Sequence, residues 1–320
     1  LMSEDYTYQR LGRFFDAARI KKILKESNIG FIGNSVYTGM LDLAVDETSA
    51  KNKFGVDIIH IDIREILDIF KNIKDKEINE LKNSFSNDYD NISLTDEQFS
   101  ISTRMALCYK KIIEKYNLPS IANYCQTTMY HPEIGIPPCL GTTYCTSRGV
   151  PFSCEGDIGS AIAMLVVKEL SGDSAFAENW MLDYEKNCVL LGHCGQGNLN
   201  YAAKKDEVRI APHPAFKESV LKGASLNFSY KDGKSTLLNI SPDNDCNWKM
   251  VIASGEVKHY PPVNMGAPHA WWESSLPVDD FVEKWCTAGS SHHAALGYGD
   301  LSETLKKLGS FLDLNIIQIK

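Results

Sequence analysis

The run CEGDIGSAIAMLVVKELSGDSAFAENWMLDYEKNCVLLGHCG, residues 154–195, carries the clearest structural pattern in the chain. Asp157 stands at the start of an apolar stretch, where an aspartate commonly caps a helix. Residues 161–170 supply the apolar faces of that helix, and Ser171-Gly172 is a typical helix end. The short apolar run at 189–192 then predicts a buried strand that ends in a glycine-containing turn.

Upstream of this run, helix and strand patterns alternate. Residues 8–26 have helical spacing, with an expected apolar stripe of Leu11, Phe14, Phe15, Ala18 and Ile23. Further helices are predicted at 64–73 and 96–116, and buried strands at 29–33, 56–61 and 120–124. This alternation favours an α/β fold with a Rossmann-like open parallel sheet that has helices on both faces.

Two stretches in the first half lack a clear periodic pattern. Residues 74–91 are the most polar part of the chain, and we expect them to form a solvated excursion. Residues 126–153 are rich in Pro, Gly and Thr, which predicts a long ordered loop rather than a helix. Long loops inside compact domains are often functional.

The second half has a different character. Residues 205–275 alternate between strand and turn signals, which indicates an antiparallel β unit. A helix at 301–312 and an apolar strand at 315–319 follow. A chain of 320 residues is long enough for two domains. We therefore predict a Rossmann-like α/β domain over 1–172 and a mixed domain with a β-barrel-like unit over 173–320.

Composition excludes several classes of protein. The net charge of −8 argues against nucleic acid or an anionic membrane as a partner, because both require a clustered positive field. No apolar run reaches the roughly 18 residues that a transmembrane helix needs. The nine cysteines show no CxxC spacing, and the N-terminus does not read as a secretory signal. These features predict reduced thiols and a cytoplasmic protein.

Four segments carry residues able to bind a divalent cation. Glu155 stands just before a helix, Glu178 follows an apolar pair, and His193 ends an apolar strand. The pair His292-His293 opens an apolar stretch near the C-terminus. Carboxylates with some imidazole suit Mn²⁺ or Mg²⁺ better than soft metals. Each residue also has a structural alternative, since a glutamate at a helix N-terminus interacts with the dipole and a histidine after a strand can simply pack.

The combination and order of these motifs resemble the L-fucose/L-arabinose isomerase family. The resemblance is carried by residues 154–195 and 289–315, extends upstream to 123–153, and includes a weaker segment at 233–241. It implies that Glu155 and Glu178 are both metal ligands and the catalytic pair that moves a proton between C1 and C2 of a sugar. His193 and His293 match the histidine ligands of the family.

The resemblance also implies a function. It predicts an aldose–ketose isomerase, an intramolecular oxidoreductase, that acts on a pentose, a 6-deoxyhexose or a related sugar through an ene-diol. Mn²⁺, or another divalent metal such as Mg²⁺ or Co²⁺, would stabilise the charge of that ene-diol. His292 and Asp157 would be residues behind the ligands or facing the substrate, although Asp157 also suits a plain helix cap. Residues 30–35 lack the third glycine of a dinucleotide motif, so no such cofactor is expected.

Members of the family carry a further N-terminal α/β domain that helps to assemble their oligomer and contacts the sugar of a neighbouring subunit. We expect a homo-oligomer, with that domain missing from this sequence or supplied by a separate subunit. A fragment, a naturally short enzyme and half of a split enzyme are all compatible with this expectation. Two other functions stay open: an epimerase or lyase that uses the same enediolate, and a non-catalytic sugar-binding or assembly subunit.

Overall fold

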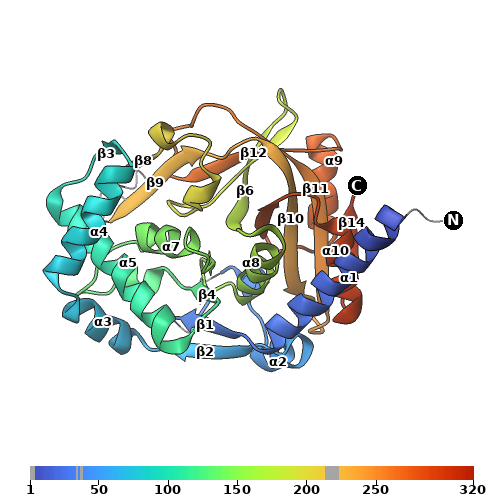
Figure 1. The fold of residues 1–320 in the computed structure, drawn as a ribbon, viewed down its shortest axis with the longest axis horizontal. Helices are drawn as coiled ribbons and strands as arrows, with labels where there is room; N and C mark the ends of the chain where they lie inside the picture. Colours follow the sequence, from blue (N-terminus) through green and yellow to red (C-terminus); the bar gives the residue numbers. More distant parts are fainter. Residues whose placement is uncertain (1–3, 34, 37–38, 213–222) are drawn as a thin grey trace.

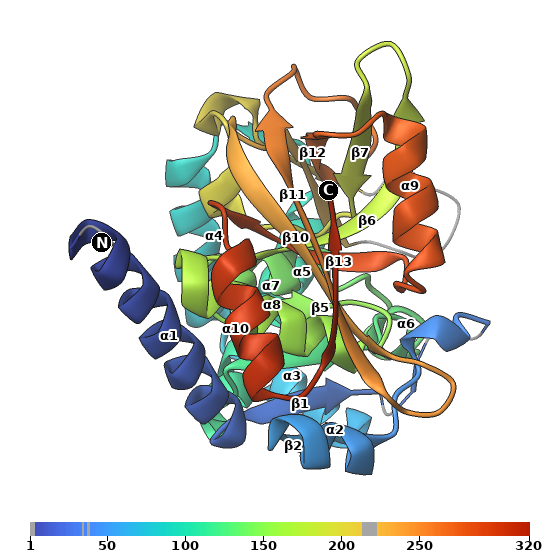
Figure 2. The ribbon, with the colours of Figure 1, turned by 90° about the vertical axis from the view of Figure 1, so that its right-hand side faces the viewer.

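A computed structural model describes residues 4–33, 35–36, 39–212 and 223–320. A small parallel sheet lies beside a larger, mainly antiparallel sheet, and helices cover the outside of both (Figures 1 and 2). The predicted fold class, an α/β Rossmann-like unit followed by a mixed unit with antiparallel strands, is confirmed.

The parallel sheet has the strand order β2-β1-β4-β5. Its strands are β1 (Asn28–Ile32), β2 (Asp57–Ile61), β4 (Ser120–Asn123) and β5 (Phe152–Ser153). The chain places β2 on one side of β1 and the later strands on the other, so the order reverses between β1 and β4. In open α/β sheets, ligands bind beyond the carboxyl ends of the strands near such a reversal.

Helices pack on both faces of this sheet, as predicted. Alternate residues of β1 point to opposite faces, so Phe31 and Ile32 belong to different buried clusters. Helices α3 (Ile63–Asn72) and α5 (Asp96–Tyr116) pack on the Ile32 side. Helices α1 (Glu4–Lys25), α2 (Glu47–Phe54) and α8 (Ile158–Ser171) pack on the Phe31 side.

Six strands of the larger sheet close into an antiparallel barrel. Each pairs with the next in the order β11-β10-β13-β6-β7-β12, and β12 pairs back with β11. Four further strands extend the sheet: β14, β9, β8 and β3. The bounds are β3 (Asn91–Ile92), β6 (Ala175–Asp183), β7 (Cys188–Gly192), β8 (Arg209–Pro212), β9 (Ala224–Ser229), β10 (Gly233–Pro242), β11 (Trp248–Lys258), β12 (Pro268–Ser274), β13 (His293–Tyr298) and β14 (Asn315–Ile319). The predicted β-barrel-like unit is confirmed, although residues 213–222 of that prediction lie outside the described residues, as does Asn34 of the glycine motif.

Helix α8 joins the two sheets. It begins after the cap Asp157 and ends at Gly172, whose φ of 87° is the left-handed geometry that favours glycine. Residues 158–167 are all buried, because α8 contacts β4 and β5 on one side and β10 and β13 on the other. A helix that is apolar on all sides requires such an enclosed position. The division into domains 1–172 and 173–320 stays a prediction.

Two predictions about the first half are wrong. The polar stretch at 74–91 contains α4 (Asp75–Asp88), which buries Ile78, Leu81 and Phe85 at helical spacing. The predicted loop at 126–153 contains α6 (Gln126–Met129), α7 (Cys139–Thr146) and β5. Every residue of α7 is buried, so this helix has no polar face and shows no amphipathic period.

The apolar stripe predicted for α1 is also wrong. The helix buries Ala17, Ile20 and Leu24, whereas Phe14 and Phe15 are 46% and 65% exposed. The reason is geometric: the N-terminal half of α1 projects away from the body of the molecule, so only its C-terminal half meets the core (Figure 2).

The remaining helices in the described part of the chain are α9 (Val278–Thr287), α10 (Ser302–Phe311) and the short 3₁₀ helices η1 (Leu41–Leu43), η2 (Leu199–Tyr201) and η3 (Lys205–Glu207). Among the described residues, no helix combines the length and the apolar character that crossing a membrane requires. All nine cysteines are free.

Candidate metal centre

Three neighbouring strands of the barrel bring distant residues into one row. Strand β6 lies between β13 and β7, and Glu178 of β6 is in register with His293 on one side and Gly192 on the other. His193 follows Gly192 directly. Residues opposite one another on paired strands have Cβ atoms about 4.5–5.5 Å apart. The antiparallel register therefore places Glu178 between the two predicted histidine ligands.

Glu155 approaches this row from the other sheet. It lies in the loop between β5 and α8, at the carboxyl edge of the parallel sheet, and its φ of 60° is unusual for a residue other than glycine. Gly156 follows with a φ of 78°, and a Cβ there would lie 2.1 Å from the backbone oxygen of Ser35. The tight backbone of this loop fixes the direction in which the Glu155 side chain points.

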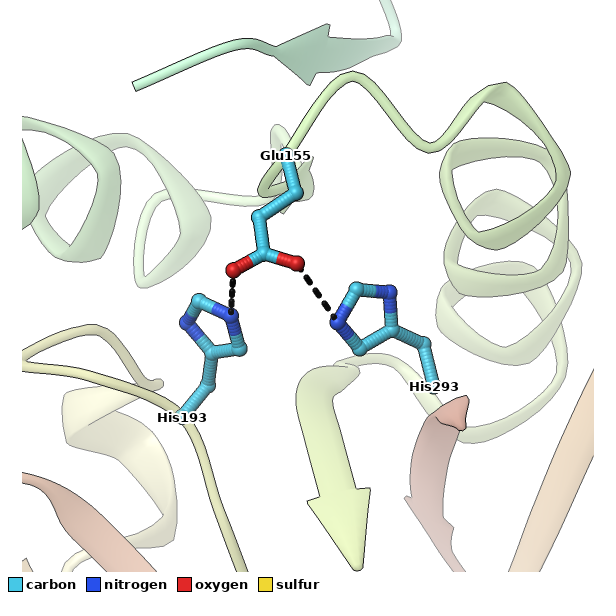
Figure 3. A group of neighbouring side chains, drawn as sticks. All are labelled: Glu155, His193 and His293. Atoms are coloured by element: carbon cyan, nitrogen blue, oxygen red, sulfur yellow. Dashed lines mark ion pairs between the residues drawn. The ribbon is translucent and has the colours of Figure 1, made fainter. Parts of the chain in front are cut away.

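The carboxylate of Glu155 points between two imidazole rings (Figure 3). Its Oε1 lies 3.7 Å from Nε2 of His193, and its Oε2 lies 3.5 Å from Nε2 of His293. One potential ligand atom from each of the three residues lies within 4.8 Å of the others. Both histidines are buried, with exposed fractions of 2% and 0%. The structure thus brings together three of the four predicted ligands.

Several polar atoms of this group have no partner. Oε2 of Glu155, Nδ1 of His193 and Nε2 of His293 are buried and make no hydrogen bond. Buried polar atoms are nearly always hydrogen-bonded, because leaving one unpaired costs about 1–3 kcal/mol. A divalent cation between the three side chains would supply the missing partner to Oε2 of Glu155 and Nε2 of His293, whereas Nδ1 of His193 lies on the side of its ring away from Glu155 (Figure 3). The donor set therefore fits a divalent metal.

Asp157 is hydrogen-bonded to His293 on the side of the ring that faces away from Glu155. Its Oδ2 accepts a hydrogen bond of 3.0 Å from Nδ1 of His293, while its Oδ1 caps α8 by accepting from the backbone N–H of Ser160. Burial lowers the pKa of His293, although Asp157 opposes that shift. With Nδ1 donating to Asp157, Nε2 of the neutral ring is free to bind a metal, and such carboxylate–histidine pairs are typical behind metal ligands. The geometry therefore contains the predicted helix cap and a hydrogen bond with a predicted ligand, while a role of Asp157 at a metal site stays a prediction.

Phe176, two residues before Glu178, packs against both rings. Its ring centroid lies 4.8 Å from that of His193 and 4.5 Å from that of His293. The phenyl group is almost fully buried and limits rotation of the two imidazoles.

Glu178 is oriented by a bulge in its own strand. The register of β6 against β7 shifts between Asn179 and Met181, so Trp180 is the extra residue. Its indole Nε1–H donates a 2.6 Å hydrogen bond to Oε2 of Glu178. The Glu178 carboxylate is therefore next to the group of three but not within it, and its metal and proton-transfer roles stay predictions.

His292 lies beside the group of Glu155, His193 and His293, between Glu155 and Asp42. Its Nδ1 lies 2.7 Å from Oδ2 of Asp42, and its Nε2 lies 3.7 Å from Oε2 of Glu155. Burial lowers the pKa of His292, but the neighbouring carboxylates of Glu155 and Asp42 outweigh it and raise the pKa to about 9. Burial likewise raises the pKa of Glu155, yet the neighbouring imidazoles of His193 and His292 hold that pKa well below the usual range.

Three residues of this centre were not found from the sequence: Asp42, Phe176 and Trp180. Asp42 lies 250 residues before His292, in a segment with no clear pattern, so nothing in the sequence links the two. Phe176 and Trp180 flank Glu178 at positions i−2 and i+2. In a regular strand the position i−2 shares a face with Glu178, which is the one signal that could have identified Phe176. The bulge at Trp180 breaks that alternation, so the sequence carries no such signal for Trp180.

Comparison with known proteins gives a class that agrees with this geometry. Residues 173–315, which include the barrel and three of the four predicted ligands, match the L-arabinose isomerase C-terminal domain. The family match starts after α8 and therefore does not include Glu155.

Individual relatives align over nearly the whole chain. The chain is 27% identical to the sulfoquinovose isomerase of Priestia aryabhattai over 309 residues, 96% of this chain and 67% of that protein. It is 22% identical to the sulfoquinovose isomerase of Alkalicoccus urumqiensis, over 98% of this chain and 69% of that protein. It is 21% identical to the L-arabinose isomerase of Escherichia coli K12, over 98% and 64% respectively.

These relatives support the predicted enzyme class, an aldose–ketose isomerase, and the L-arabinose side of the resemblance. The L-fucose side stays a prediction. The chain spans about two thirds of the length of these relatives.

Proposed function

We propose that this chain carries the metal centre of an aldose–ketose isomerase. The observation that carries the proposal is the group of Glu155, His193 and His293 at the point where the two sheets meet, in which Oε2 of Glu155 and Nε2 of His293 are buried without a hydrogen-bond partner. The similarity of nearly the whole chain to sulfoquinovose and L-arabinose isomerases supports it.

The residues that would hold the metal are Glu155, His193 and His293, with Glu178 as the fourth ligand. A side-chain rotation would bring Glu178 into the group, because it is in register with His293 on the adjacent strand. Bound there, a divalent metal would polarise the sugar oxygens and stabilise negative charge that develops on them. Two carboxylates with two imidazoles are a mixed oxygen and nitrogen set, which favours Mn²⁺ or Co²⁺ over Mg²⁺.

The two glutamates are suited to proton transfer. In the open-chain aldose, one carboxylate removes the proton from C2 while the carbonyl oxygen on C1 gains a proton, which gives the ene-diol. Return of the proton to C1 and loss of the proton on the C2 oxygen give the ketose. Glu155 comes from the edge of the parallel sheet and Glu178 from the barrel, so a sugar bound at the metal would lie between the two carboxylates. Because the neighbouring imidazoles keep the pKa of Glu155 low, this carboxylate stays ionised at neutral pH.

The proposed partner is a small-molecule sugar. Sulfoquinovose and L-arabinose are the first candidates, because relatives named for these sugars align over nearly the whole chain. A pentose, a 6-deoxyhexose or a related sugar defines the wider class. A homo-oligomer is part of the proposal, and the exposed apolar side chains of α1, which include Leu11, Phe14 and Phe15, support it. Sedimentation of the purified chain would test that part.

The central test is ketose formation. The purified protein is incubated with Mn²⁺ and a panel of aldoses, and the ketose product is measured by NMR. We expect Glu178→Gln to abolish turnover while the circular dichroism spectrum stays unchanged. Glu185→Gln is the matched control, because Glu185 is exposed in the turn between β6 and β7 and does not belong to the metal group. Unchanged turnover in Glu178→Gln would refute the proton-transfer role.

Metal binding is tested separately. Anomalous scattering from crystals soaked in Mn²⁺ should place one ion about 2.0–2.5 Å from atoms of Glu155, His193 and His293. An ion bound elsewhere, or none at saturating Mn²⁺, would refute the metal centre.

A further inference from the structure

His292 is held by one carboxylate in two ways. Oδ2 of Asp42 lies 2.7 Å from Nδ1 of the imidazole and accepts a 3.3 Å hydrogen bond from the backbone N–H of the same histidine. Asp42 lies in η1, which follows the carboxyl end of β1, whereas His292 directly precedes β13 of the barrel. This contact therefore ties the edge of the parallel sheet to the barrel beside the metal group.

The contact with Asp42 determines where the hydrogen of the ring lies. An ionised carboxylate can only accept hydrogen bonds, so Nδ1 of His292 must carry the hydrogen. In the neutral ring, Nε2 is then a bare acceptor, and in the charged ring it is a donor. Either way, it is Nε2 that faces the site.

Nε2 of His292 is aimed at the metal group and has no partner of its own. It lies 3.7 Å from Oε2 of Glu155, is buried, and makes no hydrogen bond. The ring also packs against that of His293, with the centroids 4.0 Å apart and the planes inclined by 45°, which restricts its rotation. A substrate oxygen next to the metal group would lie within reach of this nitrogen.

We propose that Asp42 is a positioning residue of the isomerase, which fixes the tautomer and orientation of His292 so that Nε2 meets a sugar oxygen. This inference rests on the proposed function for its effect on turnover. The placement of His292 by Asp42 does not depend on it, and the two can be measured apart.

The effect on catalysis should appear in kcat. In Asp42→Asn, the amide N–H₂ can donate to Nδ1 of the ring, which favours the tautomer with hydrogen on Nε2. Nε2 of the neutral ring would then be a donor instead of an acceptor. Loss of a residue that orients a functional histidine typically costs about 10- to 100-fold in activity. We expect Asp42→Asn to lower kcat by this amount and to leave the dissociation constant for Mn²⁺ unchanged, because Asp42 touches none of the ligand atoms.

The experiment uses the full chain with three variants: Asp42→Asn, Asp42→Glu and Asp46→Asn. Asp42→Glu keeps an acceptor and should restore part of kcat. Asp46→Asn is the matched control, because Asp46 lines the same 530 Å³ hollow as Asp42 but only caps α2, a role that asparagine also fills. Its kcat should equal that of the unsubstituted protein.

A second readout follows the ring itself. In protein labelled with ¹⁵N-histidine, the His292 signals are assigned by their loss in His292→Gln. The spectra are recorded above pH 9, where the ring is neutral, because below its pKa of about 9 the ring carries hydrogen on both nitrogens. There we expect hydrogen on Nδ1 in the unsubstituted protein, a shift toward Nε2–H in Asp42→Asn, and a return to Nδ1–H in Asp42→Glu. This measurement needs no substrate.

The outcomes separate the two proposals. If the unsubstituted protein converts no aldose but the tautomer of His292 still follows residue 42, the proposed function fails and the positioning role of Asp42 stands. If the tautomer is the same in Asp42→Asn as in the unsubstituted protein, or if Asp46→Asn lowers kcat as much as Asp42→Asn does, the positioning role is refuted.

Discussion

Asp157 performs two tasks that a pair of substitutions can separate. It caps α8 and accepts a hydrogen bond from the buried Nδ1 of His293. Alanine at position 157 removes both interactions. Asparagine keeps an oxygen for the cap, but its N–H₂ group faces the ring and favours hydrogen on Nε2 of His293, the atom that faces Glu155. Asp46, which caps α2 and touches no histidine, is the reference for a cap alone.

The size of each effect follows from these contacts. Loss of a cap costs about 1 kcal/mol, which is the expectation for Asp46→Ala. Asp157→Ala also leaves Nδ1 of His293 buried and unpaired, which adds about 1–3 kcal/mol. Unfolding entropy of about 2.1 cal/mol/K per residue, taken over 320 residues, converts 1 kcal/mol into a Tm change of roughly 1.5 °C. We therefore expect a loss of about 3–6 °C for Asp157→Ala and about 1–2 °C for Asp46→Ala.

The assays are thermal unfolding followed by circular dichroism and Mn²⁺ titration by calorimetry. Asp157→Asn should unfold at a temperature closer to that of the unsubstituted protein than Asp157→Ala does, yet bind Mn²⁺ about 10- to 100-fold more weakly. Equal Tm losses in Asp157→Ala and Asp46→Ala, together with unchanged Mn²⁺ affinity in Asp157→Asn, would refute the double role of Asp157.

Two further predictions concern backbone geometry and pH. Gly156→Ala should weaken Mn²⁺ binding and lower the Tm by more than Gly172→Ala does, because both glycines have a positive φ but only at Gly156 would a Cβ collide with backbone; equal losses in thermal unfolding would contradict this. Burial lowers the pKa of His269, whose Nδ1 bonds to the carbonyl of Ala267 and whose Nε2 accepts from the N–H of Val263. The unfolded chain therefore takes up this proton first, so the ring adds stability above pH 6.5 that is lost as the pH falls, by at most about 1.4 kcal/mol per unit. An NMR titration that gives His269 a pKa of 6.5 or higher would show that this reasoning is wrong.

Elements with a periodic pattern could be predicted from the sequence, and those without one could not. Helix α5 and strand β14 have the predicted bounds, because one shows helical spacing over its length and the other is a short apolar run. Helix α7 was missed because it is buried on every side and contains glycine and threonine. Helix α4 is hidden for another reason: its buried Ile78, Leu81 and Phe85 recur at helical spacing, but they stand among mostly polar residues.

The candidate site, too, could be predicted only in part from the sequence. Glu155, His193 and His293 were named from motif order, and the structure places them together. The order of the motifs does not predict the strand register that places Glu178 beside His293. It does not predict the contact between Asp42 and His292 either. Contacts of this kind depend on how two sheets pack, and a residue in an irregular segment carries no sign of its distant partner.

The proposed ligands come from residues 155, 193 and 293, and they meet only after β13 has joined β6 and the loop before α8 has reached the barrel. The unfolded chain therefore offers no local site at which a metal could nucleate structure. During refolding, the chain would then bind metal only late, when the two sheets have docked and the contacts between distant strands have formed. The rate of a metal-sensitive signal in a stopped-flow refolding experiment would therefore report the rate of this last folding step.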